Sequence, residues 1–130
     1  MLTVGGTFAT GTGEARSAVF VLPYGIERAV WSRAGGADNS LGGFRIKASA
    51  DDEVLCRRPD DGTDTNNFYE AQCNLTAHAG KKVYILIEDK HTSGWGRVWV
   101  ANITFQNEAG GLLLRESTTH CALCALAHIA

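Results

Sequence analysis

The chain has 130 residues, a length that corresponds to a single domain rather than to a two-domain enzyme with a cleft between its parts. Hydrophobic residues make up 45% and charged residues 20%, which is enough apolar material for a core and too little charge for a disordered chain. The formal net charge of -2 excludes the basic surface of a general nucleic-acid-binding protein. No apolar segment approaches the roughly 20 residues of a membrane-spanning helix, so we expect neither nucleic acid nor a membrane span among its interactions.

Short segments of alternating apolar and polar residues recur between Gly-, Asn- and Asp-rich turns, and this period of two is typical of half-buried β-strands. Fifteen glycines and two prolines suit tight turns better than long helices. In chain order, we predict strands at residues 18–22, 28–32, 43–48, 54–57, 68–73, 82–88 and 97–105. In the last of these we expect Trp99, Ala101, Ile103 and Phe105 to face the core.

The segment 83–87 is apolar at every position, which predicts a central strand covered on both faces. No helical period separates the predicted strands, so we expect an all-β protein with antiparallel sheets packed as a sandwich over residues 1–107. Residues 108–130 lack the alternation, and we expect a dispensable C-terminal tail there, either a short helix or a disordered segment. The alternative is that Leu112, Leu113 and Leu114 dock across an open sheet edge.

Cys56 and Cys73 lie in two predicted strands that flank one polar loop, a separation that suits a disulfide between neighbouring strands. Closing such a loop stabilises the folded state by about 3 kcal/mol in the chain-entropy model, and two buried free thiols are the alternative. Together with the glycosylation sequons at Asn74 and Asn102, this pair favours an extracellular or secretory compartment, although no secretory signal is visible at the N-terminus.

The sequence contains no recognisable catalytic motif. No serine lies in a Gly-x-Ser-x-Gly elbow, residues 11–16 lack the end of a phosphate-binding loop, and the acidic runs at 51–53 and 60–61 are typical of solvated loops. Cys121, Cys124 and two nearby histidines in the tail are candidate metal ligands, but they come from one short segment with no second knuckle. We therefore expect no enzymatic activity, no cofactor and no metal site.

Trp95 lies between two glycines in a polar turn that joins two strongly predicted strands. Its ring either lies at the surface or packs as a lid over the core. A surface ring can stack on the C–H face of a sugar while nearby Asp, Asn and Arg side chains bond to hydroxyls. The turn therefore suits carbohydrate recognition, with a packed structural tryptophan as the alternative.

The same part of the chain resembles the galactose-binding-like β-sandwich domains, a jelly-roll superfamily that includes many carbohydrate-binding modules. The resemblance rests on Gly80-Lys81, the strand that ends in Glu88-Asp89, the turn Gly94-Trp95-Gly96 and the segment Val100-Ala101-Asn102-Ile103-Thr104-Phe105. It extends back through residues 17–20 and 35–44, and so covers residues 3–107.

The resemblance implies an antiparallel, lectin-like jelly roll with ligand-binding loops at one end. Domains of this kind usually begin with another strand before residues 5–8, so we expect that strand to be missing here and one sheet edge to be incomplete. Many members also hold a structural calcium ion through an acid in the final strand, where this sequence has Ala101. We therefore expect no stabilisation by calcium.

These observations predict a non-catalytic carbohydrate-binding module that binds a glycan or glycoconjugate through loops at one end of the sandwich. The residues that we expect to bind the ligand are Arg33, Asp38, Asn39, Asp89 and Trp95. Trp95 would stack on the sugar, the carboxylates and the amide would bond to hydroxyls, and Arg33 would donate to a ring or glycosidic oxygen. The alternatives are a structural or protein-interaction sandwich of an extracellular protein without a sugar site, and a detached accessory domain of a glycoside hydrolase. In either case the chain could belong to a larger multidomain protein.

Overall fold

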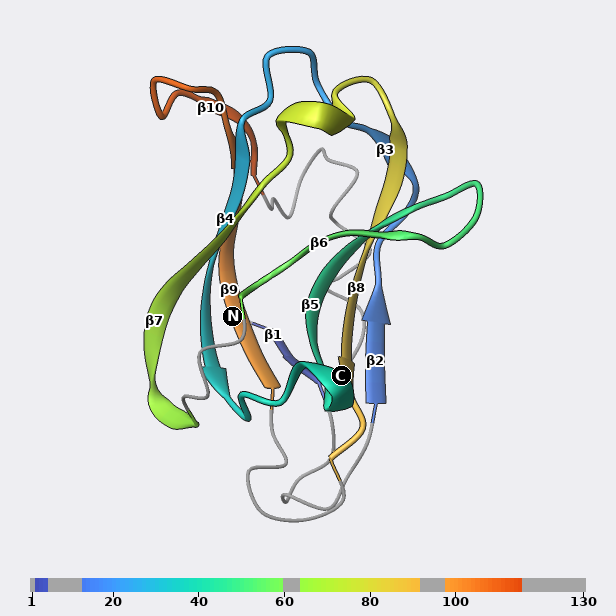
Figure 1. Ribbon diagram of the computed structural model, residues 1–130. Coiled ribbons are helices and arrows are strands. Elements are labelled where there is room, and N and C mark those ends of the chain that lie inside the picture. Colours follow the sequence, from blue (N-terminus) through green and yellow to red (C-terminus); the bar gives the residue numbers. More distant parts are fainter. Residues whose placement is uncertain (1, 5–12, 60–63, 92–97, 116–130) are drawn as a thin grey trace.

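The computed structural model describes residues 2–4, 13–59, 64–91 and 98–115 (Figure 1). Within these residues the chain forms ten β-strands and two single-turn 3₁₀-helices. The strands are β1 (Leu2–Val4), β2 (Gly13–Arg16), β3 (Phe20–Val21), β4 (Arg28–Gly35), β5 (Gly42–Ala48), β6 (Val54–Arg57), β7 (Thr65–Asn74), β8 (Lys82–Asp89), β9 (Val98–Gln106) and β10 (Leu112–Arg115). The 3₁₀-helices are η1 (Asn39–Leu41) and η2 (Thr76–His78).

The strands form two antiparallel sheets that pack face to face as a β-sandwich (Figure 1). The first sheet has the order β1-β9-β4-β7, and the second has the order β2-β8-β5-β6. In each sheet two short strands share one edge, because β10 pairs with the far end of β9 and β3 pairs with the far end of β8. The all-β sandwich is thus confirmed, and the edge that we expected to be incomplete carries β1 and β10.

Every predicted strand is present, and β6 has the predicted bounds. Three short strands were not predicted, namely β1, β2 and β10. The alternation of apolar and polar residues is hard to recognise over three or four residues, and these strands form because each lies beside a long central strand that supplies their hydrogen bonds.

The core is built around β8, which lies inside its sheet between β5 and the pair β2 and β3. Val83, Ile85 and Ile87 face the opposite sheet, and Tyr84 and Leu86 are also buried on the outer face. This confirms the prediction of a central strand covered on both sides. Aromatic rings fill the space between the sheets, and their closest pairs are Trp31–Phe44, stacked at 4.2 Å, and Phe20–Phe105, edge to face at 5.6 Å.

The predicted inward face of β9 is correct only in its second half. A β-bulge interrupts the pairing of β4 with β9, and Asn102 in this region has a φ of 55°. Because the bulge adds one residue, the face that points inward changes there, and Val98 and Val100 join the core in place of Trp99 and Ala101. Trp99 instead lies against Phe68 of β7, with ring centroids 6.4 Å apart.

The segment after residue 107 begins with a β-strand, whereas we expected a helix or a disordered tail. Gly110 has a φ of 82° and closes a turn in which the Asn107 side chain accepts a hydrogen bond from the Gly111 N–H at 2.7 Å. The two glycines therefore continue the sheet as a hairpin instead of ending it. Leu113 and Leu114 of β10 are partly buried against the core, as the docking alternative required, whereas Leu112 is 53% exposed. Residues 116–130, which include the tail cysteines, lie outside the described residues.

A disulfide joins Cys56 of β6 to Cys73 of β7, with their Cα atoms 5.8 Å apart. These two strands are edges of different sheets, so the bond ties the two layers of the sandwich together. Disulfides persist mainly in oxidising compartments, which this bond therefore favours. No helix among the described residues is long and apolar enough to cross a membrane.

We predict that the double substitution Cys56→Ala and Cys73→Ala lowers the free energy of unfolding by about 3 kcal/mol, because it removes a constraint on the unfolded chain. Chemical denaturation of both proteins, made in an oxidising compartment, measures the difference. Non-reducing peptide mapping of the unmodified protein should recover both residues in one cross-linked fragment. Recovery of two freely alkylated thiols from protein never exposed to reductant would contradict the prediction.

We also predict that strand β10 contributes to stability, which replaces our expectation of a dispensable tail from residue 108. A chain that ends at Asn107 loses the packing of two half-buried leucines, worth about 2 kcal/mol in total, and leaves half of the β9 edge unpaired. The matched control is a chain that ends at Arg115, which keeps β10. Thermal melts should show a lower midpoint for the shorter chain, and equal midpoints would mean that β10 is dispensable.

Candidate functional site

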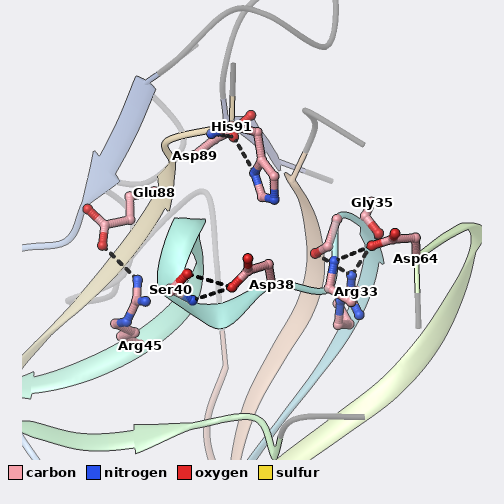
Figure 2. Close-up of polar contacts among 11 residues, drawn as sticks. Arg33, Gly35, Asp38, Ser40, Arg45, Asp64, Glu88, Asp89 and His91 are labelled. Carbon is pink, nitrogen blue, oxygen red and sulfur yellow. Dashed lines mark hydrogen bonds and ion pairs between the residues drawn. The ribbon is translucent and has the colours of Figure 1, made fainter. Parts of the chain in front are cut away.

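Four of the five predicted ligand-binding residues lie at one end of the sandwich, where β4 and β8 end and where η1 leads into β5 (Figure 2). Arg33 is near the end of β4, Asp38 and Asn39 begin η1, and Asp89 is the last residue of β8. We call this region the loop end. Trp95, the fifth residue, lies outside the described residues. The fold therefore brings the described four together, and their surroundings differ sharply.

Arg33 points into the sandwich and is buried. Its guanidinium donates hydrogen bonds to the Tyr69 hydroxyl and to the carbonyl oxygens of Gly35 and Gly36, the last two at 2.9 and 2.8 Å. It also lies over the Tyr69 ring, 4.9 Å from the centroid. These contacts hold the end of β4 in place, so they give Arg33 a structural task in addition to the sugar-binding role that we predicted for it.

Asn39 is also buried, and its side-chain amide donates to the Arg58 carbonyl oxygen at 3.0 Å. Its own carbonyl oxygen accepts a hydrogen bond from Arg45, which in turn pairs with Glu88 at 2.6 Å. Asn39 thus connects η1 to the segment after β6 and to β5. This network fixes the path of the chain between the two sheets.

Asp38 is the exposed member of the set and caps η1. One oxygen of its carboxylate accepts hydrogen bonds from the Ser40 hydroxyl at 2.6 Å and from the Ser40 N–H at 2.9 Å. These bonds, the hydroxyl first, together with nearby His91, lower the pKa of Asp38 below its ordinary value of 3.8. The carboxylate is therefore charged at neutral pH and available at the surface.

Asp89 and His91 form a buried pair at the end of β8, and sequence reasoning missed His91. Asp89 has no exposed surface and His91 is 5% exposed. The Oδ1 atom of Asp89 accepts hydrogen bonds from the His91 N–H at 2.9 Å and from its ring atom Nδ1 at 2.7 Å. Figure 2 shows the imidazole between Asp89 and Asp38, with its other nitrogen turned toward Asp38. The sequence signal that could have identified His91 is its position two residues after Asp89, close to the end of the apolar segment 83–87.

The space between these side chains is small. A pocket of about 10 Å³ lies among Trp31, Phe44, Asn39 and Arg33, which is room for about one water molecule. Small-molecule pockets are commonly 300–1,000 Å³ in volume. The gap between these described side chains is therefore too small to enclose a ligand larger than water. Among residues 2–4, 13–59, 64–91 and 98–115, no three His, Cys, Asp or Glu side chains gather closely enough to hold a metal ion.

A scan against protein-family models and a search of the curated proteins found no match for this chain.

We predict that Ser40→Ala raises the pKa of Asp38 toward 3.8, because it removes the hydroxyl that contributes most to the lowered value. A carboxylate whose pKa is lowered by folding stabilises the folded state above its unfolded pKa. That contribution disappears as the pH falls through the folded pKa. Carboxyl ¹³C chemical shifts followed across an acid titration measure the change. Ser49→Ala is the control, since this exposed serine follows β5 at the opposite end, and an unchanged titration of Asp38 in Ser40→Ala would contradict the assignment.

Proposed function

We propose that this chain is a non-catalytic carbohydrate-binding module that contacts glycans at the loop end. The observation that carries the proposal is the exposed, charged carboxylate of Asp38, which lies beside the largely buried imidazole of His91 that Asp89 orients. Both groups can bond to sugar hydroxyls, and Ser40 holds the Asp38 carboxylate while the buried Asp89 holds the His91 ring, so both are in position without ligand. Trp95 is expected to add a stacking surface in the turn after His91.

The pairing of the strands supports the finer proposal of a galactose-binding-like jelly roll. In a jelly roll a long antiparallel hairpin wraps into two sheets, so strands from the start and the end of the chain become neighbours. Here β1 pairs with β9, β2 with β8, β4 with β7 and β5 with β6. These nested pairs alternate between the two sheets, as that wrapping requires.

An extracellular or secretory location fits the same proposal. The Cys56–Cys73 disulfide favours an oxidising compartment, and the sequon residues Asn74 and Asn102 are both exposed. Glycans are abundant ligands in that environment. Mass spectrometry of protein secreted by a glycosylating host would test whether the two sequons are used.

A protein-interaction sandwich is the second candidate, and one observation favours it. Phe68 is 42% exposed on the outer face of the first sheet, where it lies against Trp99. Exposed aromatic rings are enriched at protein interfaces. This surface is on a sheet face and not at the loop end, so substitutions at Phe68 and at Asp38 separate the two candidates.

We predict that the purified protein binds glycans on an array and that Asp38→Ala weakens the binding at least about tenfold, because a hydrogen bond to a charged acceptor is lost. Calorimetry with the strongest array ligand measures the loss. Asp51→Ala is the matched control, since Asp51 is an exposed aspartate in a turn at the opposite end of the sandwich. Phe68→Ser should also leave the affinity unchanged. The absence of binding to any glycan would overturn the proposal.

A further inference from the structure

Two aromatic side chains meet on the outer face of the first sheet. Trp99 of β9 and Phe68 of β7 lie with their ring centroids 6.4 Å apart, and Phe68 is 42% exposed. Their strands flank β4, whose Ala34 pairs with Trp99 and is buried. We call Trp99 and Phe68 the aromatic platform. It offers an apolar surface of the kind that packs against the C–H face of a sugar ring.

A glycosylation sequon lies on the same strand, three residues after Trp99. Asn102 is exposed and lies in the bulge of β9, where its φ is 55°. The next residue, Ile103, points into the core, and the exposed Asn102 side chain lies outside the sandwich. Because a strand rises about 3.3 Å per residue, about 10 Å separates the Cα atoms of Trp99 and Asn102, a gap that an asparagine side chain and its attached sugars can bridge. The sequon therefore places the root of a glycan beside the aromatic platform.

The edge of β9 beside Asn102 is divided between two short strands. β1 pairs with residues 98–100, and β10 pairs with residues 104–106. Asn102 lies between these two strands and at the surface. A bulky substituent there displaces none of the strand pairing in the described part of the chain.

Asn74, the other sequon residue, has different surroundings. It ends β7 at the end of the sandwich opposite to the loop end, where it pairs with Arg28 of β4. Its side chain accepts a hydrogen bond from the Thr76 N–H at 2.9 Å, and the Thr76 hydroxyl donates to Glu27 at 3.0 Å. Phe68 lies six residues earlier on the same strand, which is about 20 Å away. A glycan at Asn74 is therefore an internal reference for one at Asn102.

We propose that Asn102 carries an N-linked glycan whose first sugar packs on the aromatic platform. In the modification, the Asn102 amide nitrogen bonds to C1 of N-acetylglucosamine in a lipid-linked oligosaccharide. The bond from C1 to the lipid diphosphate breaks, and the amide loses one proton. The apolar face of the sugar then shields both rings from water, while its hydroxyls stay solvated. The proposal rests on the secretory location proposed above and not on glycan binding at the loop end, and it gives Phe68 an intramolecular partner in place of another protein.

The packing is tested on the full chain secreted from a glycosylating yeast. The variant Asn74→Gln keeps the sequon at Asn102, and mass spectrometry measures the occupancy of that site. An endoglycosidase trims the glycan to its first sugar. An amidase removes the whole glycan and converts Asn102 to aspartate, which suits the same backbone conformation. Hydroxyl-radical labelling then measures how accessible the aromatic platform is in each of the three forms.

We expect the aromatic platform to be labelled less in the glycosylated and trimmed forms than in the deglycosylated form. Labelling of the buried Trp31 and of Tyr24, which is 85% exposed, should be the same in all three forms. The matched control is Asn102→Asp, which keeps the glycan at Asn74 and should label the platform like the deglycosylated form. Equal labelling of the platform in all forms overturns the proposal, and so does an unoccupied Asn102.

Thermal unfolding of the same Asn74→Gln protein is a second measurement. The trimmed form should melt about 3 °C above the deglycosylated form, which is the shift expected of one sugar–aromatic contact in a domain of this length. Phe68→Ser should reduce this difference in melting temperature. Glu70→Ser, at an exposed position on the same face of β7, should preserve it. An equal difference in the two variants would contradict packing on the aromatic platform.

Discussion

The burial of β8 on both faces is the constraint on which the rest of the sandwich depends. A strand that contacts the opposite sheet with one face and lies under side chains on the other must be apolar along its length, as residues 83–87 are. Its neighbours β5, β2 and β3 then supply the hydrogen bonds that its backbone needs. The apolar run ends at Glu88, which faces outward, and Asp89, which faces inward. The polar structure of the loop end begins at that point.

The chemistry of the loop end follows from how its buried polar groups are satisfied. Arg33 and Asn39 each bind backbone carbonyl oxygens where a strand or turn ends. Removal of either side chain would leave buried acceptors unpaired, which costs on the order of 1–3 kcal/mol for each group. Asp89 differs because its partner, His91, reaches the edge of the surface. In the Asp89–His91 pair, the imidazole donates to the buried carboxylate and its other edge lies toward Asp38. Arg33 and Asn39 instead hold backbone segments of the sandwich in place.

The longer strands could be predicted from sequence because each has enough residues for its apolar pattern to be recognised, whereas β1, β2 and β10 are only three or four residues long. The faces that we predicted wrongly depend on local backbone features, and the alternation of apolar and polar residues does not reveal these features. Asn102 introduces a bulge that exchanges the two faces of β9, and no alternation of apolar residues signals it, because both Trp99 and Val100 are apolar. Gly110 and Gly111 led us to predict that the sandwich ends before them, although the same residues also suit a hairpin turn. Only the pairing of β10 with β9 distinguishes these two outcomes.

The clustering of the four described residues at one end was predictable, and their burial was less so. The order of the strands places residues 33, 38, 39 and 89 at one end, as the resemblance implied, but burial depends on which face of a strand each one occupies. Arg33 follows Ala29 and Trp31 at a spacing of two, so it belongs to the inward face once β4 is known to extend to Gly35. The predicted strand ended at residue 32, so the spacing of two was not extended to Arg33. His91 was missed because its orientation depends on a hydrogen bond to Asp89, two residues earlier in the chain, and not on any repeating pattern.

Under the proposed function, the small space between the described side chains of the loop end has a consequence for affinity. A ligand that rests on Asp38 and His91 buries little surface and gains few hydrogen bonds, so a single site of this kind binds weakly. Weak sites become effective when several act together, because a tethered second contact forms at a high effective concentration. If the chain is the carbohydrate-binding module that we propose, it is therefore suited to repeated glycans or to a place within a larger assembly, where the disulfide-linked sandwich keeps Asp38 and His91 in position.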